Sequence, residues 1–105
     1  MTVKFCSKAY MTRGFKNEIP DDIKLVLFRI IQQMAAKDDK DVDYLQIFRL
    51  SAKRICNMQF QQIEHSQEVP PKKDTLCIPC ENPVDHKVYC IDSEEYYTFL
   101  LAEEY

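Results

Sequence analysis

Residues 20–36 read PDDIKLVLFRIIQQMAA and predict the helix around which the fold is built. Pro20 suits the first position of a helix, and Asp21 and Asp22 complement the partial positive charge of a helix N-terminus. Leu25 and Phe28 widen the apolar surface, so we expect burial along more than one face. The main stripe recurs at spacings of three and four residues and consists of Ile23, Val26, Leu27, Ile30, Ile31 and Met34.

After the charged residues 37–41, which end the helix as a solvated loop, the apolar period changes to two. Residues 44–50 (YLQIFRL) are rich in aromatic and branched side chains and predict a strand. Ser51-Ala52-Lys53 indicates a turn, and the alternation from Cys56 onward predicts a second, half-buried strand. The alternation shifts after Gln62, which predicts a bulge or bend in this hairpin.

Proline and turn residues divide the rest of the chain into short strands. Pro70-Pro71 interrupts the hydrogen bonds between strands, because proline has no amide donor. Asp92-Ser93-Glu94 indicates a turn. The predicted strands run from Thr75 to Ile78, Val84 to Ile91, Tyr96 to Ala102 and, at the N-terminus, Val3 to Met11.

These elements predict one α+β domain over residues 1–105, an antiparallel sheet of about five strands with one main amphipathic helix packed on one face. At this length folding buries enough surface to form a core without obligatory cross-links. The other sheet face is expected to carry Gln59, Gln61 and Lys87. It would therefore be wetter than the helix side, or covered by a partner.

Composition removes several classes of function. Apolar residues make up 46% of the chain and charged residues 30%, as in ordinary globular proteins. The net charge of −3 gives no global attraction for nucleic acid, and no apolar run approaches the ~20 residues that span a bilayer. The single glycine, Gly14, excludes P-loops, dinucleotide fingerprints and nucleophile elbows.

The N-terminal residues lack the apolar stretch of a signal peptide, so we expect a cytoplasmic protein. The odd number of five cysteines then indicates reduced thiols rather than a disulfide framework.

Cys77-Ile78-Pro79-Cys80, followed by His86 and Cys90, is the densest collection of potential metal or redox ligands. Its spacing approaches that of a zinc knuckle, in which thiolates and imidazole surround zinc tetrahedrally. A knuckle needs glycines for its turns, and a strand from Val84 to Ile91 would hold His86 and Cys90 roughly 13 Å apart. The strand and a four-ligand site are therefore mutually exclusive. The alternation favours the strand, with zinc as the alternative.

Two thiol chemistries are further alternatives for the cysteines. Cys77-Ile78-Pro79-Cys80 has the form of a thiol–disulfide motif, but such motifs place the first cysteine at a helix N-terminus. No βαβ pattern surrounds this one. A Cys–His nucleophilic pair that uses His65 or His86 has no local support in the sequence and stays open.

Arg13 beside Gly14 is a candidate anion-binding residue, because its guanidinium could meet a carboxylate or a phosphate. The alternative, which we favour, is that Gly14 supplies a turn with positive φ and that Arg13 pairs with a nearby acid. No catalytic residue is assigned.

Five segments, taken in order, resemble one known family. They are Met11-Thr12-Arg13-Gly14, Ile19-Pro20, Asp43-Tyr44-Leu45-Gln46-Ile47-Phe48, the run from His65 to Pro70, and Leu100-Leu101-Ala102-Glu103-Glu104-Tyr105. From Tyr10 to its end the chain resembles a family of small proteins from Gram-positive bacteria, known as domain of unknown function 960. The resemblance implies a bacterial, cytoplasmic protein and brings no activity, ligand or catalytic residue. The cysteine cluster is not part of the pattern.

The leading hypothesis is a small non-enzymatic module that binds a protein partner, or associates with itself, through an edge strand or the open sheet face. No cofactor is expected, and neither a nucleic-acid nor a membrane partner. Two alternatives stay open: a zinc-stabilised binding domain that uses Cys77, Cys80, His86 and Cys90, and a small enzyme with a Cys–His pair.

Overall fold

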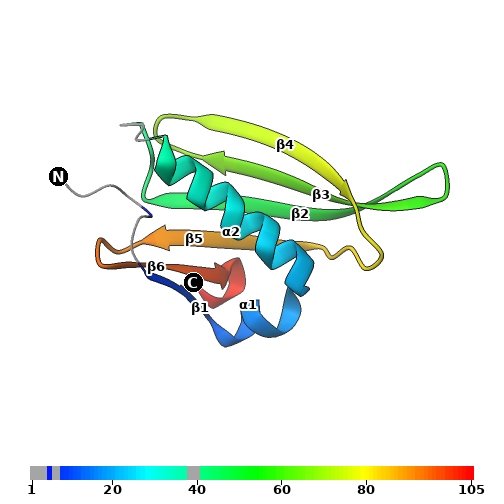
Figure 1. Ribbon diagram of the computed structural model, residues 1–105, viewed down its shortest axis with the longest axis horizontal. Helices are drawn as coiled ribbons and strands as arrows, with labels where there is room; N and C mark the ends of the chain where they lie inside the picture. Colours follow the sequence, from blue (N-terminus) through cyan, green and yellow to red (C-terminus); the bar gives the residue numbers. More distant parts are fainter. Residues whose placement is uncertain (1–4, 6–7, 38–40) are drawn as a thin grey trace.

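The structure, a computed structural model, describes residues 5, 8–37 and 41–105. In chain order its elements are β1 (Lys8–Met11), α1 (Arg13–Glu18), α2 (Asp21–Ala36), β2 (Leu45–Ile55), β3 (Met58–Gln67), β4 (Lys72–Pro79), β5 (His86–Asp92), β6 (Tyr96–Leu101) and the 3₁₀ helix η1 (Ala102–Glu104) (Figure 1). The strands form one sheet in the order β1-β6-β5-β2-β3-β4. The predicted α+β class is confirmed. No helix in the described ranges is long and apolar enough to cross a membrane.

The sheet is mixed rather than antiparallel, and it has six strands rather than five. β1 runs parallel to β6, with Lys8 opposite Tyr96 and Met11 opposite Phe99, whereas the other neighbouring strands are antiparallel. Residue alternation could not reveal this, because side chains alternate between faces in both kinds of pairing. The predicted N-terminal strand begins at Lys8 as described; of the earlier residues only Phe5 lies within the described part.

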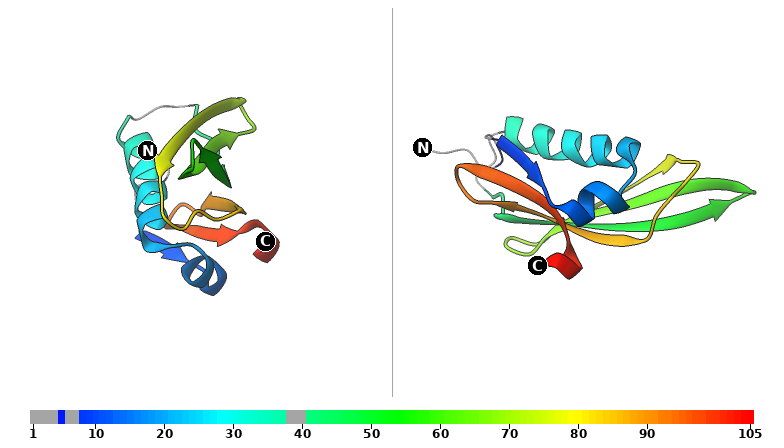
Figure 2. Two further views of the ribbon diagram at one scale, coloured as in Figure 1. Left: turned by 90° about the vertical axis from the view of Figure 1, so that its right-hand side faces the viewer. Right: turned by 90° about the horizontal axis from the view of Figure 1, so that it is seen from below.

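Helix α2 lies across one face of the sheet and buries a single stripe against it (Figures 1 and 2). The expectation of burial along more than one face is wrong for Leu25, which is 50% exposed. A helix on the outside of a single sheet has one side against the strands and the other in water. The centre of the core contains Ile23, Leu27 and Ile31 from α2, with Phe48, Val88 and Phe99 from the strands.

The β2–β3 hairpin is longer and more regular than predicted. Ser51-Ala52-Lys53 continues β2, and the turn lies at Cys56 and Asn57, both with positive φ. The register runs without interruption from Ile47 opposite Ser66 to Ile55 opposite Met58, so the predicted bulge is absent. The end of this hairpin extends beyond α2 (Figure 1). The residues at this end do not pack on the core, so they need not alternate between apolar and polar. For this reason the alternation placed the turn wrongly at Ser51-Ala52-Lys53.

Gln59 and Gln61 are on the helix side of the sheet, because Gln61 pairs with Ala52 and Gln59 with Arg54 in the register that places Ile63 in the core. Their predicted position on the opposite face is wrong, although Lys87 does lie on that face, opposite Arg49. Gln61 is fully buried, and its amide donates to the carbonyls of Ser51 and Val84 and accepts from the Val84 amide. It therefore fastens the β4–β5 connection to the hairpin.

Helix α1, which sequence reasoning missed, is held by contacts between the two ends of the chain. Thr12 caps it by accepting from the amide of Phe15. The Glu104 carboxylate accepts from the Thr12 hydroxyl at 2.6 Å, the Gly14 amide at 3.1 Å and the Leu101 amide at 2.9 Å. A Cβ on Gly14 would lie 2.6 Å from that carboxylate. Gly14 is helical, without positive φ, so the expected turn is wrong and close approach explains the glycine.

Candidate binding groove between α2 and β4

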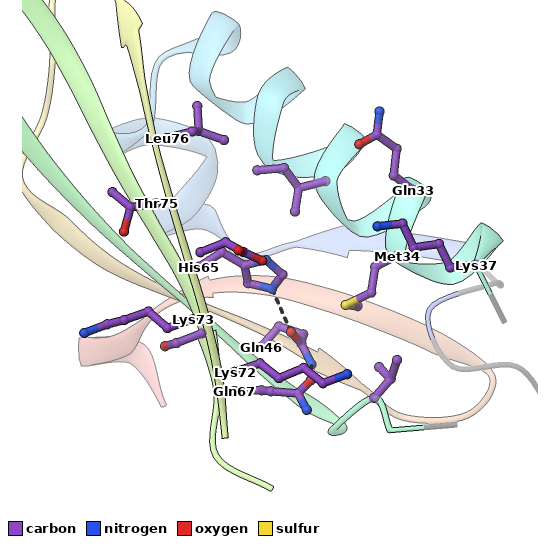
Figure 3. Close-up of a pocket in the computed structure, with 14 residues that line it drawn as sticks. Gln33, Met34, Lys37, Gln46, His65, Gln67, Lys72, Lys73, Thr75 and Leu76 are labelled. Atoms are coloured by element: carbon purple, nitrogen blue, oxygen red, sulfur yellow. Dashed lines mark hydrogen bonds between the residues drawn. The ribbon is translucent and has the colours of Figure 1, made fainter. Parts of the chain in front are cut away.

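A cavity of about 390 Å³ opens between the C-terminal half of α2 and the β3–β4 hairpin. We call it the α2–β4 groove. In Figure 3, Met34 and Lys37 line it from the helix, and His65, Gln46 and Gln67 from the strands. Its lining comprises Ile30, Gln33, Met34, Lys37, Val42, Gln46, His65, Ser66, Gln67, Lys72, Lys73, Asp74, Thr75 and Leu76. This volume lies near the lower end of the range for ligand pockets, about 300–1,000 Å³.

The floor of the groove is a chain of hydrogen-bonded side chains that begins at Gln67. The Gln67 amide nitrogen donates to the carbonyls of Asp41 and Pro70, both at 2.8 Å. Its oxygen accepts from the backbone amide of Asp43 at 3.2 Å and from Nε2 of Gln46 at 3.0 Å. Gln46 Nε2 also donates to the Asp43 carbonyl at 2.8 Å. Because backbone carbonyls accept only, both amides have one permitted orientation.

The same chain fixes the tautomer of His65. Oε1 of Gln46 lies 2.7 Å from Nε2 of His65 and has no proton to donate, so Nε2 of the histidine must donate. In the neutral ring Nδ1 is then an unprotonated acceptor. The assignment follows from the backbone carbonyls of Asp41, Asp43 and Pro70, which fix the orientation of the two glutamine amides.

The environment of His65 favours its neutral form. Its ring stacks on Phe48, with centroids 4.6 Å apart and an interplanar angle of 13°. Burial lowers the pKa of His65 below the usual 6.5, while the negative charge of Asp74 acts in the opposite direction. The groove floor is therefore uncharged near pH 7.

Three lysines and one acid, Asp74, contribute charge to the groove. Lys37 and Lys72 are exposed. Lys73 lies 2.9 Å from the Glu64 carboxylate and, by that hydrogen bond, lowers the pKa of Glu64. A basic groove on a chain of net charge −3 gives local attraction for anionic groups.

Strand β4 is an edge of the sheet, paired only with β3 among the described strands. Its hairpin curves toward the side of the sheet that carries α2 (Figure 2). An edge strand presents unpaired backbone donors and acceptors to an added strand. A segment paired with β4 on this edge would lie beside the groove and α2.

Residues of the α2–β4 groove could have been suspected from two of the segments that carry the family resemblance. Asp43 to Phe48 supplies Asp43 and Gln46, and His65 to Pro70 supplies His65, Gln67 and the Pro70 carbonyl. These segments comprise the start of β2 and the end of β3 with the residues next to them, and they meet in one hydrogen-bonded chain. No spacing within either segment indicated a site, because the contacts between the two segments join residues 19 to 26 positions apart.

The structure separates the four predicted metal-ligand candidates. Cys77 on β4 lies opposite Gln62, on the face away from α2. Cys80 follows β4 and is buried near Asp22, with Sγ to Oδ2 at 3.9 Å. His86 and Cys90 both lie on β5, four residues apart, or roughly 13 Å. Among the described residues, no group of three or more histidine, cysteine or acidic side chains could hold a metal ion.

The other predicted candidates are also apart. Cys77 lies within a strand rather than at a helix N-terminus. Burial raises the pKa of Cys90 well above its usual range, which opposes a nucleophilic thiolate. Within the described part of the chain, no thiol is hydrogen-bonded to a histidine ring, and His86 lies 3.9 Å from Glu18. Arg13 is exposed at the start of α1, outside the groove.

Comparison with known proteins gives a family and a fold. Residues 8–104 match the family described as "Staphylococcal protein of unknown function (DUF960)". No curated protein matches the chain. A crystal structure of a protein of unknown function from Enterococcus faecalis is similar, with a TM-score of 0.69 and 16% sequence identity over 100% of this chain and 96% of that one. At that identity the similarity concerns the fold alone.

Proposed function

The chain belongs to the DUF960 family of staphylococcal proteins of unknown function, and we propose that it is a non-enzymatic module that binds an acidic, extended protein segment in the α2–β4 groove. The observation that carries the proposal is the position of an apolar and basic groove beside an edge strand. We also propose that it acts in the bacterial cytoplasm, as the family resemblance and the reduced cysteines suggest.

Three kinds of contact would hold the segment. Its backbone would pair with the edge of β4, as in β-strand addition. One apolar or aromatic side chain would enter between Ile30, Met34 and Leu76, and flanking carboxylates would meet Lys37 and Lys72 at the rim. Backbone pairing supplies affinity without sequence preference, so the pocket and the lysines would set specificity.

The test is selection of random linear peptides displayed on phage against the whole protein, followed by fluorescence anisotropy on the enriched sequences. We expect acidic peptides with one large apolar or aromatic residue, and binding that weakens as salt rises. Amide shifts in the nitrogen–proton NMR spectrum should concentrate in β4 and the second half of α2. Enrichment of basic peptides, or shifts centred elsewhere, would contradict the proposal.

Matched variants locate the binding surface. Lys37→Glu should weaken an acidic peptide about three- to tenfold, a loss of roughly 0.6–1.4 kcal/mol, whereas Lys16→Glu on α1 makes the same charge change outside the groove. Leu76→Ser removes an apolar wall, and Leu25→Ser does the same on the outer side of α2, where Leu25 is 50% exposed. Equal effects of Lys37→Glu and Lys16→Glu would show a response to net charge and reject the groove.

Zinc binding by Cys77, Cys80, His86 and Cys90 was the alternative, and the separation of the four residues argues against it. Elemental mass spectrometry on protein purified without chelator or affinity tag tests it, beside a count of titratable thiols in denaturant. Near-stoichiometric zinc would support it, while five titratable thiols without metal would exclude it.

A further inference from the structure

The floor of the α2–β4 groove contains one acceptor that the fold leaves uncommitted. His65 uses Nε2 to donate to Gln46, and no described residue donates to Nδ1. No side-chain nitrogen or oxygen in the described part is both fully buried and without a partner. Nδ1 therefore keeps some accessible surface, and the His65 ring lines the cavity (Figure 3).

The surroundings of Nδ1 select among possible bound groups. A carboxylate would place its lone pairs against that of Nδ1 and near the Asp74 charge. A cation would meet Lys37, Lys72 and Lys73 around the opening. A purely hydrocarbon side chain would fill the apolar walls but leave Nδ1 without water or a donor.

We infer that the deepest part of the groove takes a tyrosine side chain of the bound segment, whose phenol hydroxyl donates to Nδ1 of His65. The inference rests on the proposed function, which supplies the acidic segment that carries the tyrosine. The phenol ring packs between Met34 and Leu76, and its hydroxyl replaces water at the one free acceptor of the floor. His65 is thus the specificity-determining residue.

The expected selectivity is against phenylalanine. A site built to hydrogen-bond a hydroxyl discriminates against the analogue that lacks it, because its own polar group is then left unpaired. We expect a tyrosine peptide to bind about tenfold more tightly than its phenylalanine counterpart. The preference should fade as acid protonates Nδ1, since the imidazolium has no acceptor.

A variant can remove this acceptor while keeping the rest of the floor. His65→Gln places an amide nitrogen where Nε2 lies and can still donate to Gln46, but it has no atom equivalent to Nδ1. The tyrosine preference should fall to about onefold in His65→Gln. His86→Gln, which changes the other histidine outside the groove, should retain it. Circular dichroism melting of both variants checks that the fold persists.

The closing experiment uses small probes, so that it does not depend on finding a peptide. 4-Methylphenol and toluene have the same ring and methyl group and differ by one hydroxyl. We expect 4-methylphenol to shift His65 and Leu76 signals in NMR titration, with a dissociation constant about five- to tenfold lower than that of toluene. Long-range nitrogen–proton spectra of the His65 ring should show an unprotonated Nδ1 near pH 7 that changes on 4-methylphenol binding.

The outcomes separate the two ideas. Equal binding of the two probes, no binding of either, or a protonated Nδ1 at neutral pH would each overturn the tyrosine inference. If the probes behave as expected but selected peptides bind outside the groove, the proposed function fails while the phenol site stands. If acidic peptides bind in the groove with equal affinity for tyrosine and phenylalanine, only the inference fails.

Discussion

At the scale of single residues, the close contact between the Glu104 carboxylate and Gly14 accounts for the presence of both residues. Glu104 accepts hydrogen bonds from the Thr12 hydroxyl and the Gly14 amide at the start of α1 and from the Leu101 amide before η1. The hydrogen bond from Thr12 contributes most to the lowering of the pKa of Glu104. A residue with a Cβ atom at position 14 would collide with the Glu104 carboxylate, so glycine lets the carboxylate approach the α1 backbone. The family-like segments at residues 11–14 and 100–105 therefore contact each other and form one structural feature rather than two separate sites.

The effect of Gly14→Ala on stability should be opposite in sign with and without the Glu104 side chain. Inside an exposed helix this replacement normally stabilises by about 0.8–1 kcal/mol, but here the new methyl group would displace Glu104. We expect Gly14→Ala to lower the melting temperature in the wild type and to raise it in a Glu104→Ala background. Thermal unfolding of the four proteins in this cycle tests the coupling. Additive effects would show that the close approach has no energetic consequence.

His65 should make the stability depend on pH. Its pKa in the folded protein lies below 6.5, so the unfolded chain binds a proton first as the pH falls. The free energy of unfolding should therefore be constant above about pH 6.5, decline below it, and level off once the folded protein is also protonated. Urea unfolding from pH 7.5 downward, with His65→Gln as the control, measures the difference. A parallel decline in both proteins would assign the loss to the carboxylates.

At the scale of elements, α2 is the part that sequence periodicity described best. Its apolar stripe follows from spacings of three and four residues, and its bounds from Pro20 and the charged sequence at 37–41. The width of the buried surface did not follow, because Leu25 is apolar but lies on the outer side. Apolar periodicity shows which residues lie on the same side of a helix. It does not show how many sides of the helix pack against the rest of the protein.

Leu27 and Leu25 form a matched pair for this distinction. Leu27→Ala should destabilise the protein by about 2–5 kcal/mol, because Leu27 is fully buried against the sheet. Leu25→Ala removes the same atoms from an exposed position and should cost less than about 0.5 kcal/mol. Chemical denaturation of both variants measures the two values. A cost for Leu27→Ala as small as that expected for Leu25→Ala would mean that α2 does not pack on this face.

Some strands could be predicted from the sequence, whereas their ends and their pairing could not. β5 was predicted from the alternation that core packing imposes on it, and β6 from its mostly apolar residues. The end of the β2–β3 hairpin was not, because it extends past α2, and neither were the parallel partner of β6 or helix α1. The α2–β4 groove could not be predicted either, since Gln46, His65 and Gln67 come together only through strand pairing.

At the scale of the whole molecule, the two ends of the described chain form one structural unit. β1 pairs with β6, and α1 is capped partly by Glu104 from η1. The groove lies toward the opposite edge of the sheet, between α2 and strands β2, β3 and β4. Binding at β4 and closure of the ends are therefore separated by the width of the sheet.

Deletion of Glu103–Tyr105 should loosen that unit without affecting the groove. We expect faster amide hydrogen exchange in β1 and α1, because the Thr12 hydroxyl and the Gly14 amide lose their acceptor. Protection in β3 and β4 should change only by the shift in global stability. Glu103→Ala, a substitution at an exposed neighbour, is the control. Uniform loss of protection across all strands would instead indicate that the whole domain unfolds as one unit.

The pairing of β1 with β6 also has a consequence for synthesis. Ribosomes deliver the N-terminal strand first, yet Gly14 and its partner Glu104 are separated by 90 residues. A nascent chain must therefore expose the edge of β1 through most of translation, while the β2–β3 hairpin can already form from neighbouring residues. Sheet assembly would proceed from the middle outward, and β1, which precedes the other strands of this sheet in the chain, would be among the last to pair.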